Sequence, residues 1–338
     1  MNFSSDTAAP AHPAILEAMV AAASGPTPSY GADPWTKSAR DALCEVFETD
    51  LDIWLASSGT AANALALSIL CPPHGATLCH EEAHIERDER GAPEFFTGGG
   101  KLSLLPGAHA KIDLAALRQR IAYNNPGFVH ETPQHVLSLS NLTESGAAYT
   151  AAEIAERATL AREADLAVHL DGARFANALV STGATPADMS WRAGVDVLSF
   201  GATKNGGAGC EAIILFGSAR PRLHELQVRA KRAGHMPPKM RFLGAQMTAY
   251  LKDGLWLQLA RNANSTAKAL SQALVKAGAE LVHPVDGNEV FAKLPPGAAG
   301  RLAKAGATFY PWPDGSHRFV CSWATTQKEV ADLAANVG

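Results

Sequence analysis

Short apolar runs alternate with helix-forming segments over the first two-thirds of the chain, and this alternation constrains the fold more than any other feature. Residues 34–48, 61–70 and 151–163 have the composition and spacing of helices. Strand-like runs are expected at 52–56, 76–79, 101–105, 136–140, 166–170, 195–200 and 212–216. Strands that alternate with helices are typical of a mostly parallel, doubly wound α/β sheet.

The pattern changes near residue 240. A break at His235–Pro238 is followed by helix formers over 242–277 and by strand-like runs at 289–293 and 318–322. We therefore predict two domains: an N-terminal arm with a large domain over 1–240, and a small α+β domain over 241–338. A length of 338 residues also favours two domains over one.

Composition and charge exclude several classes of protein. The chain has 29 Lys and Arg against 33 Asp and Glu and no basic block, so nucleic-acid binding is not expected. The longest uncharged stretch, residues 53–80, contains Ser, Asn and two Pro residues, so a membrane span is not expected either. The N-terminus lacks a signal-peptide pattern, and the five cysteines are scattered without a CxxC pair. Reduced thiols in a cytoplasmic protein are the expectation.

Two motifs resemble known ligand sites, but their context argues against that use. His80–His84 matches the zinc pattern HExxH, yet it follows an apolar strand and precedes a charged segment, so no metal is predicted. A loop that carries one useful histidine is the better interpretation. Gly98–Lys101 lacks both the full phosphate-loop pattern and GxGxxG, and we expect a turn there.

Three polar features each follow an apolar strand, at the sheet edge where open α/β folds bind ligands. Ser58–Thr60 begins a helix whose amides can bind a phosphate, although Ser and Thr are also common helix caps. Asp171 ends a strand; Arg174, close behind it, can pair with this carboxylate or hold the carboxylate of a ligand. Lys204 follows the next strand among small residues, where it is either solvated or desolvated enough to act as a nucleophile.

Together these groups match the needs of one cofactor. Pyridoxal 5'-phosphate (PLP) requires a phosphate site, an acid beside its pyridine nitrogen and a lysine for a Schiff base. The sequence supplies them in Ser58–Thr60, Asp171 and Lys204, so PLP is the predicted cofactor.

Several segments also match a known family. They read Ser5-Asp6-Thr7, Tyr30-Gly31-Ala32-Asp33-Pro34, Ser58-Gly59-Thr60, His169-Leu170-Asp171-Gly172-Ala173-Arg174 and Ser199–Gly206. Over nearly its whole length the chain resembles the low-specificity L-threonine aldolases, and within them the branch that includes phenylserine aldolases. The resemblance implies an aspartate-aminotransferase-like large domain (PLP fold type I). It also implies an aldehyde-lyase that cleaves L-threonine, L-allo-threonine or another β-hydroxy-α-amino acid, such as phenylserine, to glycine and an aldehyde.

The resemblance assigns the cofactor contacts to particular residues. Lys204 would bind the aldehyde of PLP, and Asp171 would pair with the pyridine nitrogen. Gly59, Thr60 and Thr203 would hold the phosphate.

Substrate contacts follow in the same way. His84 would stack on the cofactor ring, and either His84 or His130 would remove the proton of the β-hydroxyl. Ser5, Arg174 and Arg318 would bind the substrate carboxylate.

The same resemblance implies a homodimer or homotetramer. Tyr30 would reach the neighbouring subunit's site, and Lys231 and Arg241 match basic positions near the site more loosely. The loop around Glu144 departs from the usual form of the family, so Glu144 receives no role. The open alternatives are another fold-type-I lyase (a β-eliminating lyase or a serine hydroxymethyltransferase-like enzyme) and a PLP-binding protein without turnover.

Overall fold

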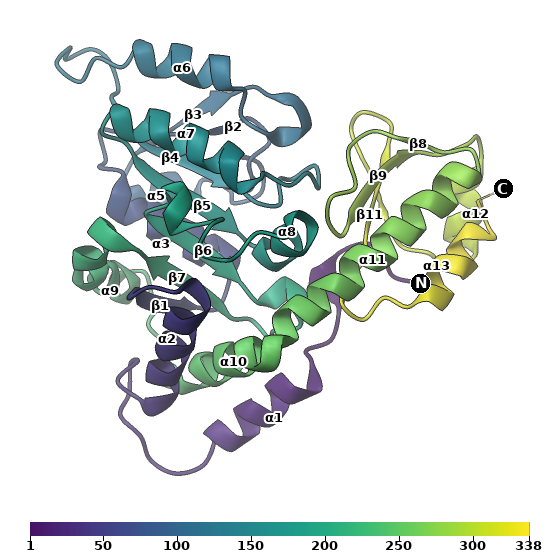
Figure 1. Ribbon diagram of the computed structural model, residues 1–338, viewed down its shortest axis with the longest axis horizontal. Coiled ribbons are helices and arrows are strands. Elements are labelled where there is room, and N and C mark those ends of the chain that lie inside the picture. Colours follow the sequence, from purple (N-terminus) through teal and green to yellow (C-terminus); the bar gives the residue numbers. More distant parts are fainter. Residues whose placement is uncertain (338) are drawn as a thin grey trace.

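The computed structural model describes residues 1–337, and its larger part is built on one seven-stranded sheet (Figure 1). The strands are β1 (Asp52–Ala56), β2 (Ala76–His80), β3 (Lys101–Leu105), β4 (Gln134–Ser140), β5 (Ala167–Gly172), β6 (Val197–Gly201) and β7 (Glu211–Leu215). Their order is β1-β7-β6-β5-β4-β2-β3, and β7 runs antiparallel to both of its neighbours. The predicted mostly parallel sheet is confirmed, and each predicted strand-like run forms a strand.

Helices pack around this sheet, and α1 packs on α10 (Figure 1). The helices of the large body are α1 (Pro13–Ala22), α2 (Pro34–Phe47), α3 (Gly59–Leu70), α4 (His84–Arg87), α5 (Ala92–Thr97), α6 (Leu114–Ala122), α7 (Ala151–Glu163), α8 (Phe175–Thr182), α9 (Leu223–Arg232) and α10 (Arg241–Leu251). Local sequence fixes several of their starts. Asp33 accepts from the Thr36 amide at 2.8 Å just before Pro34, and Thr150 with Glu153 forms a capping box at α7. Within residues 1–337, no helix has the length and apolar character needed to cross a membrane.

A smaller antiparallel sheet closes the chain. It contains β8 (Glu280–Leu281), β9 (Glu289–Lys293), β10 (Tyr310–Pro311) and β11 (His317–Val320), in the order β10-β11-β9-β8, with helices α12 (Ala298–Lys304) and α13 (Gln327–Ala334). The long helix α11 (Leu255–Lys276) runs from the large body to this sheet, and both chain ends lie beside it (Figure 1). Phe3 joins the small body, because its amide donates to Thr308 and its carbonyl accepts from Val320, each at 2.8 Å.

The apolar core consists of two clusters that meet along α11. Met247 and Trp256 pack with the large sheet, whereas Ala267 and later residues of α11 pack with the small sheet and Phe3. The first part of α11 therefore packs against the large sheet, and its later part packs against the small sheet. The division of the chain at residue 240 stays a prediction.

Candidate active site

A cavity of about 230 Å³ lies at the carboxyl ends of the parallel strands. It brings together seven residues predicted from the sequence: Gly59, Thr60, His84, Asp171, Arg174, Thr203 and Lys204. The other lining residues are Thr7, Ser57, Ser58, Asn63, Ser140, Leu142, Glu144, Ala173 and Glu211.

Close backbone packing places Asp171 and Lys204 at the same edge. A Cβ atom on Gly201 would lie 2.6 Å from the Ala173 carbonyl oxygen, so only glycine lets β6 pass this close to the turn after Asp171. Past Lys204, the buried Asn205 donates to Tyr250 Oη and to the Trp256 carbonyl, both at 2.8 Å. These contacts tie the short 3-10 helix η4 (Thr203–Asn205) to α10 and α11.

The start of α3 forms an anion site. Ser58 caps the helix by accepting from the Ala61 amide at 3.2 Å. Among the described residues, no protein acceptor binds the amides of Gly59 and Thr60, and these amides are the first of a twelve-residue helix. Unpaired amides and the helix dipole favour a phosphate here, and the Thr203 side chain lines the same cavity. The donor set therefore fits the phosphate of PLP.

Asp171 has the environment of a permanently ionised carboxylate. Its Oδ1 accepts from the Ala173 amide at 2.9 Å and its Oδ2 from Asn63 Nδ2 at 2.7 Å. Burial alone would raise the pKa of Asp171, but His84, the Ala173 amide and Lys204 together hold it below its ordinary value. Such a carboxylate fits the protonated pyridine nitrogen of the cofactor.

His84 is oriented by a buried glutamate. Its Nδ1 lies 2.9 Å from Oε1 of Glu89, which also accepts from Asn63 Nδ2 at 2.9 Å. The Glu89 side chain is completely buried, and burial raises its pKa even though His84 and Asn63 act in the opposite direction. Burial would lower the pKa of His84, but the bond to Glu89 and the charge of Asp171 raise it overall. His84, Glu89, Asn63 and Asp171 thus form one connected network.

Arg174 pairs with two buried carboxylates, and neither of them is Asp171. Its Nε lies 2.7 Å from Asp6 Oδ2, and its Nη1 lies 3.3 Å from Glu289 Oε2. Glu289 also lies 3.9 Å from Arg318, whose Nη2 donates to the Ser4 carbonyl at 3.4 Å. Burial would lower the pKa of Arg174, but Asp6 and Glu289 raise it above its ordinary value. The arginine therefore stays charged beside the cavity.

The remaining predicted residues do not line this cavity. Ser5 bonds to Thr7 Oγ1 at 2.7 Å, and Arg318 lies behind Arg174 against Glu289. His130 is exposed on the loop before β4, where its ring lies 5.2 Å from Phe128. Their roles stay predictions.

Tyr30 and the two basic positions lie together on the surface. The Tyr30 side chain is 48% exposed, and Lys231 Nζ lies 4.7 Å from the centre of its ring. Arg241 Nη1 donates to the Gly25 carbonyl at 2.8 Å. None of the three lines the cavity. The predicted roles, Tyr30 toward a second subunit and Lys231 and Arg241 near the active site, stay predictions.

The two histidines of the HExxH pattern have separate partners. His80 Nε2 lies 3.0 Å from the Gly107 carbonyl oxygen, and its Nδ1 accepts from the Glu82 amide at 3.0 Å. His84 instead binds Glu89. In the part of the chain that the structure describes, no three His, Cys, Asp or Glu side chains group as metal ligands.

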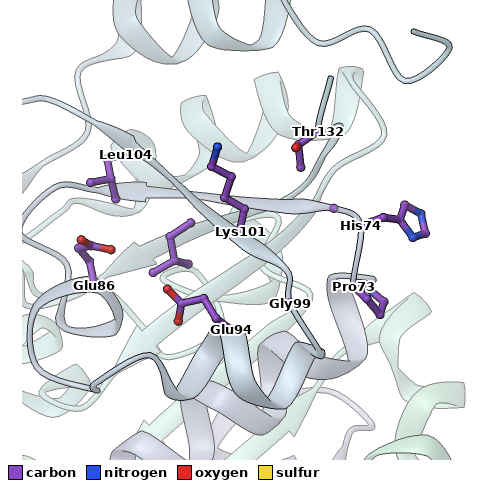
Figure 2. Close-up of a pocket in the computed structure, with 10 residues that line it drawn as sticks. Pro73, His74, Glu86, Glu94, Gly99, Lys101, Leu104 and Thr132 are labelled. Atoms are coloured by element: carbon purple, nitrogen blue, oxygen red, sulfur yellow. The ribbon is translucent and has the colours of Figure 1, made fainter. Parts of the chain in front are cut away.

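The glycine-rich segment before Lys101 borders a different cavity, of about 450 Å³ (Figure 2). Gly99 and Lys101 line it, as do the carboxylates of Glu86 and Glu94. Figure 2 shows the Lys101 side chain pointing away from both glutamates. The turn expected in this segment is present at Gly98 and Gly99.

Four polar residues of the site received no role from the sequence: Asn63, Glu89, Glu144 and Glu211. Asn63 had a detectable signal, because it is the one large polar residue within the mostly apolar run 61–70. The glutamates had none. Burial raises the pKa of Glu144 to about 7 and that of Glu211 to about 7, and in a sequence neither residue differs from a surface glutamate.

The fold and the cavity define the class of protein, a PLP-dependent enzyme of the aspartate-aminotransferase-like fold. The aspartate aminotransferase of Thermus thermophilus has this fold, with a TM-score of 0.72 at 16% identity over 97% of this chain and 88% of that one. The family model "Beta-eliminating lyase" matches residues 2–295.

Two relatives identify the family within this class of enzymes. A low-specificity L-threonine aldolase from a Pseudomonas species is 40% identical, over 99% of this chain and 96% of its own length. The Leishmania major threonine aldolase structure has a TM-score of 0.92 and 30% identity, and the alignment covers 99% of this chain and 98% of that one. The chain belongs to the low-specificity L-threonine aldolase family, within the larger group of β-eliminating lyases.

Proposed function

We propose that this enzyme cleaves the Cα–Cβ bond of L-threonine, L-allo-threonine and related β-hydroxy-α-amino acids such as phenylserine, giving glycine and an aldehyde. The observation that carries the proposal is the cavity in which Lys204, Asp171 and the start of α3 meet His84. The relatives of similar length, which are named threonine aldolases, agree with it.

Each group of the cavity has a task. Gly59, Thr60 and Thr203 hold the phosphate, Lys204 supplies the amine and Asp171 keeps the pyridine nitrogen protonated. Bound PLP supplies an electron-withdrawing ring that accepts the electron pair of the broken bond.

His84 takes a proton from the β-hydroxyl. The Glu89 carboxylate accepts the Nδ1 proton of His84, which leaves Nε2 as the ring nitrogen that is free to receive a proton. Removal of the hydroxyl proton lets the oxygen form a carbonyl group as the Cα–Cβ bond breaks. A positioned general base of this kind contributes about 10²–10⁴-fold to the rate.

Arg174 attracts the substrate carboxylate to the cavity. Its guanidinium is fixed by Asp6 and Glu289, so its position is set before the substrate arrives. Arg318 on β11 and Ser5 in the N-terminal segment would bind the same substrate carboxylate.

We also propose that the enzyme acts as a homo-oligomer in the cytoplasm. The exposed Tyr30 and its neighbour Lys231 form a polar and aromatic patch suited to a second subunit. The five cysteines are all free, which fits a reducing compartment. Light scattering of the purified protein tests the assembly, and a monomeric mass would contradict it.

The reaction is tested by product analysis of the PLP-loaded protein with L-threonine. Equal amounts of glycine and acetaldehyde are expected, and Lys204→Ala should form neither. Ammonia with 2-oxobutanoate would identify a β-eliminating lyase instead, and a strict folate requirement would identify a hydroxymethyltransferase-like enzyme. Bound cofactor without any product would leave a PLP-binding protein.

A further inference from the structure

Glu144 is a buried carboxyl group of the cavity that the proposed mechanism does not use. It lines the cavity on the loop after β4, and this loop is fixed by bonds from the Thr143 amide to Ala147 and from the Gly146 amide back to Thr143, each at 2.9 Å. The Thr143 hydroxyl also donates to the His109 carbonyl at 2.9 Å. Glu144 is therefore held in place by the backbone around it.

The Ser140 hydroxyl connects this carboxyl group to the cavity. Ser140 lines the cavity at the end of β4, opposite Asp171 in the register of β4 and β5. Its Oγ donates to Glu144 Oε1 at 2.8 Å, and the same oxygen accepts from the His84 amide at 2.8 Å. Glu144 Oε2 is buried and has no hydrogen-bond partner within residues 1–337, so this oxygen is free to bind a proton.

Several charged and titratable groups lie close enough to Glu144 to interact with it electrostatically. They are His84 on α4, Asp171 on β5, Arg174 before α8, Cys79 on β2 and, on the loop that carries Glu144 itself, Tyr149. Burial raises the pKa of Glu144 to about 7, and Asp171 acts in the same direction. The carboxyl group can therefore gain and lose a proton near neutral pH.

The stereochemistry of the substrate creates a need for a second proton acceptor. When the Cα–Cβ bond is held for cleavage and the methyl group is also held in one place, L-threonine and L-allo-threonine exchange the positions of their hydroxyl group and β-hydrogen. The hydroxyl of one epimer therefore faces a different wall of the cavity from the hydroxyl of the other. His84 and the Ser140–Glu144 pair are two separate acceptors, on α4 and at the end of β4.

We propose that His84 and the Ser140–Glu144 pair each serve one of the two β-epimers, so that the enzyme cleaves both. This inference rests on the proposed function. For the epimer that Ser140 contacts, the hydroxyl proton passes to Ser140 Oγ while the Ser140 proton passes to Glu144. The electron pair left on the substrate oxygen forms the C=O bond of the aldehyde. The electron pair of the broken Cα–Cβ bond stays on Cα. Water supplies a proton to Cα to give glycine and Glu144 releases its proton to water, so the numbers of protons lost and gained are equal.

The test compares both epimers in Glu144→Gln. For one epimer, kcat should fall about 10²-fold with little change in KM, and for the other it should stay within about threefold. In the wild type, cleavage of the sensitive epimer should decline as the pH falls through about 7, because Glu144 becomes protonated. The variant should lose this decline.

Three further variants complete the experiment. Ser140→Ala should reduce cleavage of the same epimer, and it decides the question if Glu144→Gln does not fold. His84→Ala should reduce cleavage of the other epimer. Glu156→Gln is the matched control, because Glu156 is exposed on α7 and does not line the cavity, and it should change neither rate.

Equal losses for both epimers in Glu144→Gln or Ser140→Ala would show a purely structural role and overturn the inference. Unchanged rates for both would overturn it as well. Absence of glycine from both epimers with the wild type would instead refute the proposed function, and this inference with it.

Discussion

Asp6→Asn tests whether the buried charges beside the cavity hold the two parts of the molecule together. Asp6 lies in the N-terminal segment and is buried, with Arg174 Nε at 2.7 Å and Asn288 Nδ2 at 3.0 Å. Asp6 therefore connects the large body, which carries Arg174, to the loop before β9, which carries Asn288.

The size of the effect follows from what the variant leaves unpaired. Loss of one partner of a buried ion pair costs about 3–5 kcal/mol of the free energy of unfolding. Arg174 keeps Glu289 at 3.3 Å, and the asparagine carbonyl can still accept one bond. We therefore expect the low end of the range, about 3 kcal/mol.

The effect should depend on pH with a defined sign. Burial would raise the pKa of Asp6, but Arg174, Lys204 and Asn288 lower it overall. A lowered folded-state pKa stabilises the protein fully above the unfolded-state pKa of about 3.9, and this stabilisation is lost as the pH falls below it. The difference between wild type and variant should be constant from pH 6 to 8 and shrink toward pH 3.

Urea unfolding measures this difference, and an exposed ion pair provides the control. Lys328 and Asp332 lie 2.6 Å apart on the surface of α13, where solvent screens the charges, so Asp332→Asn should leave the unfolding midpoint nearly unchanged. If Asp6→Asn shifts the midpoint no more than the control does, the buried pair does not stabilise the fold as argued.

Three further changes have defined outcomes. Gly201→Ala should lower the free energy of unfolding, measured in urea, by about 1–3 kcal/mol, because the new Cβ would lie 2.6 Å from the Ala173 oxygen. Gly300→Ala is the control and should not destabilise the fold, because its Cβ would meet no atom within 4 Å. Glu89→Gln should lower kcat roughly tenfold or more. It should also move the acidic limb of the pH profile of kcat to lower pH, because the carboxylate that raises the pKa of His84 is lost. An unchanged profile would contradict a role of Glu89 in tuning His84. Thr60→Val should raise the dissociation constant of PLP about tenfold in absorbance titrations if the hydroxyl binds the phosphate, and equal affinity would rule that contact out.

The strands, the helix after Ser58 and the positions of Asp171 and Lys204 were predictable from the sequence because their signals are local. An apolar run of five residues followed by a polar residue marks the end of a buried strand, whatever surrounds it. The antiparallel direction of β7 was not predictable in this way, because the apolar pattern of Glu211–Leu215 is the same in either direction.

Contacts between segments that lie far apart in the sequence could not be predicted from it, for a physical reason. Glu89 and Asn63 are 26 residues apart, and Arg174 meets an aspartate 168 residues away, so no spacing pattern reveals either bond. Of the two alternatives that the sequence left open for Arg174, pairing with the nearby Asp171 does not occur, because its guanidinium pairs with Asp6 and Glu289.

Mass spectrometry of the PLP-loaded protein after borohydride reduction tests the central claim most directly, because reduction fixes the cofactor on the lysine that carries it. The account predicts the added pyridoxyl mass on the peptide that contains Lys204, and its loss in Lys204→Ala. Label on a different lysine of the wild-type protein, or no label at all, would contradict the assignment of the site.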